Sequence, residues 1–158
     1  MHSEVDQLHT IGLLAAHESA IADLYRAYAE KLPERREFFD RLAADEVTHA
    51  RRIAGFVQGV RTGSVSIDPG RFSEETIIAS LDHVRKQVEQ GRKTNVSLVD
   101  ALSISADIEN AMIERRFFDV FEGDSGELKQ LLRGLAAATE AHRARLLQAL
   151  EKERQAAG

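Results

Sequence analysis

The sequence predicts an all-α protein, because three features favour helices throughout the chain. Only two prolines, Pro33 and Pro69, occur in 158 residues. The segments between the turn signals are rich in Ala, Leu, Glu and Arg, which are strong helix formers. Apolar residues recur three, four and seven positions apart, whereas the strict alternation typical of strands is hard to find. We therefore expect one helical domain spanning residues 1–158.

Turn signals and apolar periods divide the chain into four long helices and one short helix. The long helices are expected at about Val5–Lys31, at about Pro33–Val60, from after Ser97 to about Phe121, and from after the turn at 122–126 to about Arg154. Tight turns make the first two helices antiparallel neighbours, and likewise the last two. A short helix, Glu74–Gln90, lies within the crossover from Arg61 to Val96. This layout predicts an antiparallel four-helix bundle with a long crossover between its second and third helices.

Composition and charge exclude several functional classes. The chain has no Cys, which rules out disulfides, thiolate zinc sites, iron–sulfur clusters and a cysteine nucleophile. The net charge is −5 and the signs are interspersed, so we expect no nucleic-acid partner. No apolar run approaches the roughly 20 residues of a membrane span. The opening MHSEVDQLHT lacks the order of a signal peptide, so we expect a cytoplasmic protein without a membrane anchor.

Acids and histidines interrupt the apolar stripes near the middle of each long helix. The spacing aligns Glu18 with Leu14 and Ile21 in the first helix, and Tyr25 lies seven residues further on. The other three helices carry series with the spacing i+4, i+3, i+4. These series are Leu42, Glu46, His49 and Ile53; Leu102, Ala106, Glu109 and Ile113; and Leu135, Thr139, His142 and Leu146.

Inward carboxylates are costly unless they are paired, protonated or bound to a cation. Any one of these acids alone is more simply explained as a rim or interface residue, and Glu-x-x-His alone is a weak signal. The conjunction is more specific, because Glu18, Glu46 and Glu109 would meet His49 and His142 in one core. Carboxylate oxygen and imidazole nitrogen suit iron, manganese or zinc, so we expect a site for one or two metal ions.

Four segments resemble the ferritin-like superfamily, and its rubrerythrin-type members most closely. They are AHESAIADLYRAYA, FFDRLAADEVTHARRI, DALSISADIENAMIERRFF and LLRGLAAATEAHRARLL. The resemblance implies two metals between four helices, held by single glutamates from the first and third helices and Glu-x-x-His pairs from the other two. Glu18 and Glu109 resemble the single glutamates, and Glu46 with His49 resembles one pair. His142 resembles the histidine of the second pair.

The second pair departs from the family pattern at Thr139, which stands where the family has a glutamate. The internal repeat makes this clear, because LAADEVTH at 42–49 parallels LAAATEAH at 135–142. The neighbouring Glu140 is rotated by about 100° around the helix. Four outcomes stay open: a helix shift brings Glu140 in, a partner subunit supplies an acid, one metal binds, or none binds.

The resemblance implies an iron-dependent oxidoreductase that couples Fe(II) oxidation to peroxide or dioxygen, with Tyr25 close enough to tune the site or donate to it. Rubrerythrins of full length carry a four-cysteine domain, which this chain lacks, so a redox cycle would need an external electron donor. The alternative is a structural or interaction module whose site has decayed at Thr139. Iron storage in a cage is a weaker third reading, since a fifth C-terminal helix is not obvious.

We also expect a homodimer. Phe117, Phe118 and Phe121 lie near the end of the third long helix, where the sequence predicts that they are exposed. A partner subunit would cover them.

Overall fold

The computed structural model describes residues 3–67, 74–123 and 125–157, and these are almost entirely helical. The α-helices are α1 (Glu4–Lys31), α2 (Arg36–Ala54), α3 (Phe56–Thr62), α4 (Glu74–Lys93), α5 (Leu98–Arg115) and α6 (Gly126–Ala157). Two 3-10 turns, Pro33–Arg35 and Phe117–Val120, accompany them. The all-α prediction is confirmed. Part of the predicted break at 61–72 lies outside the described residues.

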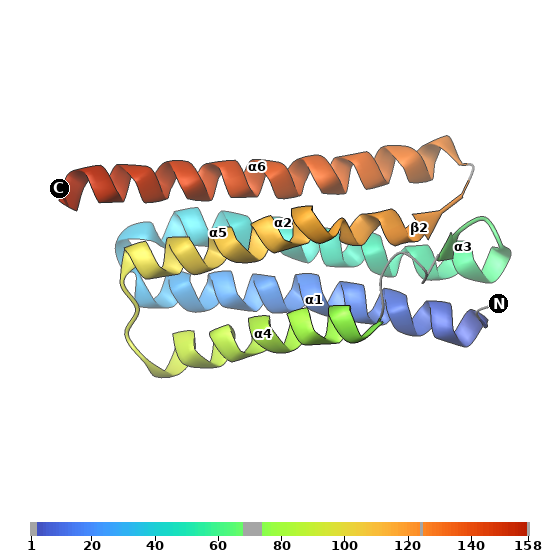
Figure 1. Ribbon diagram of the computed structural model, residues 1–158, viewed down its shortest axis with the longest axis horizontal. Coiled ribbons are helices and arrows are strands. Elements are labelled where there is room, and N and C mark those ends of the chain that lie inside the picture. Colours follow the sequence, from blue (N-terminus) through green and yellow to red (C-terminus); the bar gives the residue numbers. More distant parts are fainter. Residues whose placement is uncertain (1–2, 68–73, 124, 158) are drawn as a thin grey trace.

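The helices lie side by side along the length of the molecule (Figure 1). The helix α1 packs against α2 on one side and against α4 on another, and α5 packs against α6. The short helix predicted inside the crossover is therefore present as α4, and it covers α1. None of the helices in the described ranges is both long enough and apolar enough to cross a membrane.

Side-chain caps fix the starts of two of the long helices. Ser3 and Asp6 form a reciprocal capping box at the start of α1. The Ser97 hydroxyl accepts the backbone N–H of Asp100 at 3.1 Å at the start of α5. These caps satisfy N–H groups that have no partner within the helix.

The second and third predicted long helices end earlier than expected. The second breaks at Gly55, and α3 then continues to Thr62 before Gly63 ends it with a φ of 82°. Gly55 itself keeps helical angles and donates its N–H to the carbonyl oxygen of Arg51, so the break is a turn of a single residue. The third ends at Arg115, because Arg116 adopts a left-handed conformation with a φ of 51°.

The prediction that Phe117, Phe118 and Phe121 are exposed is wrong. They are 1%, 8% and 5% exposed within the single chain. The 3-10 turn after α5 directs the first two inward, and a continuous helix would have spread them around its surface. Phe121 and Glu122 form β2, which pairs antiparallel with β1 (Ser66–Ile67). The exposed phenylalanines that suggested a homodimer are therefore absent from the described part of the structure, and the homodimer stays a prediction.

Candidate metal centre

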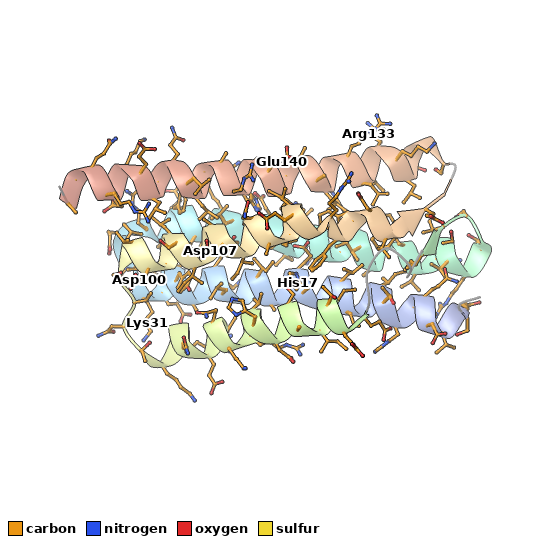
Figure 2. The ribbon with its side chains drawn as sticks, in the orientation of Figure 1. His17, Lys31, Asp100, Asp107, Arg133 and Glu140 are labelled. Atoms are coloured by element: carbon orange, nitrogen blue, oxygen red, sulfur yellow. The ribbon has the colours of Figure 1, made fainter. Side chains whose placement is uncertain are left out.

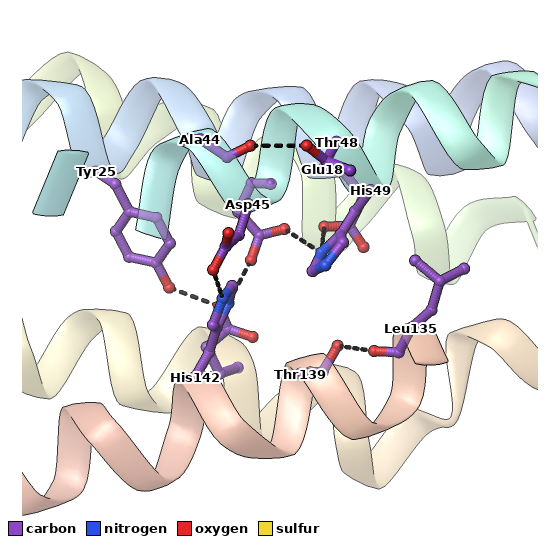
Figure 3. Close-up of polar contacts among 11 residues, drawn as sticks. Glu18, Tyr25, Ala44, Asp45, Thr48, His49, Leu135, Thr139 and His142 are labelled. Atoms are coloured by element: carbon purple, nitrogen blue, oxygen red, sulfur yellow. Dashed lines mark hydrogen bonds and ion pairs between the residues drawn. The ribbon is translucent and has the colours of Figure 1, made fainter. Parts of the chain in front are cut away.

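Five predicted ligands come together in the interior of the molecule. Glu18 comes from α1, Glu46 and His49 from α2, Glu109 from α5 and His142 from α6, and none of the five is more than 4% exposed. The i+3 and i+4 spacings place each side chain on the stripe that its helix buries. Figure 3 shows the histidines and carboxylates converging between the helices.

The first group of donors consists of Glu18, Glu46 and His49. Each offers one ligand atom, and these atoms lie within 4.8 Å of one another. The His49 Nδ1 is 3.3 Å from Glu46 Oε2 and 4.0 Å from Glu18 Oε2. Such spacing suits a single cation placed among the three atoms.

The second group consists of Glu46, Glu109 and His142, whose ligand atoms also lie within 4.8 Å of one another. The His142 Nδ1 is 2.9 Å from Glu46 Oε1 and 3.4 Å from Glu109 Oε1. Glu46 therefore belongs to both groups, with Oε2 directed at His49 and Oε1 at His142. Although α6 contributes only His142, the second group therefore contains two carboxylates.

The ionisation of these groups shows the cost of burying three acids together. Burial, followed by repulsion from Glu46, raises the pKa of Glu18 well above its usual range. Burial raises the pKa of Glu109 to about 8, with the charge of Glu46 adding to the effect. Hydrogen bonds from Glu18, His142 and His49 outweigh burial at Glu46 and hold the pKa of that carboxyl well below its usual range.

His142 supplies the positive charge that balances this cluster. Burial alone would lower the pKa of the imidazole, but its hydrogen bonds to Glu109 and Glu46 and their charges raise the pKa to about 10. The pKa values of Glu109 and His142 lie above neutral pH, so protons on these two groups offset part of the buried negative charge.

The donor set fits a divalent cation. Glu18 Oε2 and Glu109 Oε2 are buried without a hydrogen-bond partner among the described residues. Orphaned carboxylate oxygens inside a protein are costly, and a cation would satisfy them. Oxygen and imidazole donors without thiolates match iron, manganese or zinc.

Tyr25 and Asp45 hold two of the ligands in place. The hydroxyl of Tyr25 donates a hydrogen bond of 2.6 Å to Glu109 Oε1, so the side chain predicted as catalytic does lie at the cluster. Asp45 Oδ2 is 3.0 Å from His142 Nε2, which leaves Nδ1 facing the carboxylates. A carboxylate on the far nitrogen is the usual way to orient a ligating imidazole.

Sequence reasoning missed Asp45 because the side chain lies outside the apolar stripe and is 48% exposed. The internal repeat was the one feature of the sequence that could have drawn attention to Asp45. Asp45 precedes Glu46, and the corresponding residue before Thr139 is Ala138. The half of the repeat that contains His142 therefore lacks both acids.

Thr139 is buried on the inward stripe of α6, as predicted, but it contributes no carboxylate. Its hydroxyl donates to the carbonyl oxygen of Leu135 at 2.9 Å, so it is engaged with its own helix. Glu140 is exposed and belongs to neither donor group. His17 is buried instead against α4, with Nε2 2.8 Å from Ser80 Oγ, and also lies outside both groups (Figure 2).

Comparison with known proteins adds no family assignment to this geometry. No protein-family model matches the chain, and neither curated proteins nor solved structures give a significant match.

Proposed function

We propose that this chain is a ferritin-like, rubrerythrin-type metal-carboxylate protein that binds iron at two adjacent positions in its core. In this proposal α1, α2, α5 and α6 are the four helices of the bundle, and α4 is the helix of the crossover. The observation that carries the proposal is Glu46, whose two oxygens face histidines on different helices. A carboxylate shared in this way suits two neighbouring cations.

The first position would be held by Glu18, Glu46 and His49, and the second by Glu46, Glu109 and His142. Iron bound there would supply the one-electron chemistry of Fe(II) oxidation by peroxide or dioxygen. Manganese and zinc are compatible with the same donors. Because the chain has no cysteine, repeated turnover would need an external electron donor.

The roles of the protein are to position the ligands and to exchange protons. Asp45 orients His142, and Tyr25 holds Glu109 through its hydroxyl. Cation binding would displace the protons on Glu109 and His142, since each donor must present a lone pair to a metal. A cation would then compensate the carboxylates in place of those protons.

A structural module with a decayed site is the second candidate. Thr139 favours it, because the hydroxyl is bonded to Leu135 and α6 contributes no carboxylate to the cluster. Without a metal, the protonated His142 also compensates the charge of the Glu46 carboxylate. The two candidates differ in what a chelator does, because only a bound metal stabilises the folded chain through linkage.

The test is anaerobic titration of metal-free protein with Fe(II), with bound metal measured by elemental analysis after gel filtration. We expect saturable binding in the wild type and in Glu37→Gln, which removes an exposed acid of α2. Glu46→Gln should abolish tight binding, since both positions depend on this residue. Peroxide added to the loaded protein should then consume Fe(II). Absence of saturable binding in the wild type would support the structural module instead.

A further inference from the structure

A pocket of about 280 Å³ lies between α5 and α6. Its walls combine residues of α5, the turn after α5, and α6. They are Met112, Ile113, Arg116, Phe118, Asp119, Ala136, Thr139 and Glu140.

The pocket reaches the interior of the molecule at three of these residues, since Met112, Phe118 and Thr139 are 4%, 8% and 3% exposed. Met112 and Thr139 lie on the buried stripes of α5 and α6. Met112 is three residues from Glu109, and Thr139 is three residues from His142. Three residues correspond to a rise of roughly 4.5 Å along a helix, so the floor of the pocket lies one turn from two proposed ligands.

The short side chain of Thr139 leaves this approach open. The internal repeat aligns Thr139 with Glu46, whose longer side chain carries a carboxylate into the cluster. The hydroxyl oxygen of threonine lies two bonds closer to the backbone than the carboxylate oxygens of glutamate. Its hydroxyl hydrogen is given to Leu135, which leaves the oxygen free to accept only.

The chemistry of the walls selects a small uncharged molecule. The volume is below the range typical of pockets for drug-sized ligands. Arg116 is ion-paired to Asp119 at 2.8 Å, and Glu140 adds a second acid. An anion would therefore be repelled more than attracted. Hydrogen peroxide is small and uncharged at neutral pH, and it could donate to the threonine oxygen.

We propose that this pocket admits hydrogen peroxide to the second metal position, from the side where Thr139 replaces a carboxylate. The role of peroxide as the oxidant rests on the proposed function. Entry of peroxide into the pocket does not rest on it and can be measured in the metal-free protein.

Met112 is a built-in reporter of entry. Peroxide transfers one oxygen atom to a thioether sulfur, giving methionine sulfoxide and water, and susceptibility follows exposure. The metal-free protein is treated with dilute peroxide, and sulfoxide at Met112 is followed by peptide mass spectrometry. We expect oxidation of Met112 in the wild type to be measurable but slower than that of free methionine, because the side chain is only 4% exposed.

The pocket is then filled from α6 with Ala136→Leu and Ala136→Phe, and Ala137→Phe is the matched control. Both alanines are exposed, and only Ala136 lines the pocket. Circular dichroism verifies that each variant is folded. If Ala136→Phe does not fold, the comparison is made with Ala136→Leu. We expect oxidation of Met112 to slow progressively, by about tenfold with phenylalanine, and to stay unchanged in the control. Equal rates in Ala136→Phe and Ala137→Phe, or a Met112 that resists peroxide in the wild type, would overturn the proposal.

A second arm uses the Fe(II)-loaded protein. At equal metal content, Ala136→Phe should slow consumption of Fe(II) by peroxide, and Ala137→Phe should not. Equal rates would contradict delivery through the pocket. A wild type that binds no metal would instead contradict the proposed function, and that result is separate from the Met112 measurement.

Discussion

At the scale of single residues, the cluster contains fewer acids than two divalent cations require. Three carboxylates, from Glu18, Glu46 and Glu109, carry three negative charges when ionised, against four positive charges on two ions. The first ion is fully compensated, and the second leaves an excess of positive charge in a medium of low dielectric. Thr139 occupies the position that the internal repeat aligns with Glu46, so α6 supplies no fourth acid.

We predict that Thr139→Glu raises the metal content towards two ions per chain and increases peroxide-dependent oxidation of Fe(II). The matched control is Thr139→Gln, which has a similar shape without the charge and should leave the content unchanged. The metal-free Thr139→Glu protein should lose roughly 3 kcal/mol of stability, because it buries another acid among like charges. Elemental analysis and urea unfolding measure the two effects. If the wild type already binds two ions and the substitution adds none, another group supplies the fourth ligand, Glu140 being the first to test.

The protonated cluster also predicts how the stability of the metal-free protein depends on pH. The folded state raises the pKa of Glu109 to about 8 and of His142 to about 10. Raised values contribute stability that is present below the unfolded pKa and lost as pH rises through the folded one. The urea midpoint should therefore fall as the pH rises from about 4.5 to about 10, most steeply between about 6.5 and about 8, where both groups contribute.

Glu109→Gln tests this pH dependence, because it mimics the neutral acid. It should flatten the decline, whereas Glu37→Gln should not. A midpoint that rises across the same interval would contradict the assigned protonation. Metal affinity should change in the opposite direction and increase with pH, since protons and cations compete for the same donors.

At the scale of helices, the sequence predicted where the elements lie better than where they end. The apolar periods located each long helix, because burial of a stripe dominates over local preference. The ends depend on backbone conformations that periodicity does not encode. The left-handed Arg116 stops α5 before Phe121, and the two-residue pairing of β1 with β2 joins segments far apart in sequence.

The two glycines around α3 provide a matched test at this scale. Gly55 is exposed with a φ of −63°, and an added Cβ would lie 3.2 Å from the carbonyl oxygen of Arg52 in the preceding helical turn, so Gly55→Ala should join α2 to α3 and stabilise the chain by at most roughly 0.5–1 kcal/mol. Gly63 has a φ of 82°, so Gly63→Ala should destabilise by roughly 1 kcal/mol. Urea midpoints of the two variants should move in opposite directions. Shifts of the same sign would contradict these backbone assignments.

At the scale of the whole molecule, the convergence of Glu18, Glu46, His49, Glu109 and His142 was predictable because each one interrupts an apolar stripe. Periodicity identified the inward face of each helix, and the cost of burying charge indicated a common cluster. The sharing of Glu46 and the orientation of His142 by Asp45 were not predictable, since both depend on distances between helices. The prediction that Phe117, Phe118 and Phe121 are exposed was wrong for a related reason, because the 3-10 turn after α5 changes the direction of the chain.

A bound metal should connect the stability of the whole molecule to the cluster. Removing it with a chelator should lower the melting temperature of the wild type, because the cation binds only the folded arrangement of ligands. Glu46→Gln should melt at the same temperature with and without chelator. A wild type whose melting is insensitive to chelator after loading with Fe(II) would contradict this link.

The most direct test of the central claim is a crystal structure of the iron-loaded protein with anomalous scattering measured at the iron edge. We predict a strong peak among Glu18, Glu46 and His49. The peak among Glu46, Glu109 and His142 should be weaker, because a cation there must displace the protons on both Glu109 and His142. A crystal of the loaded protein without an anomalous peak among these five side chains would contradict the account.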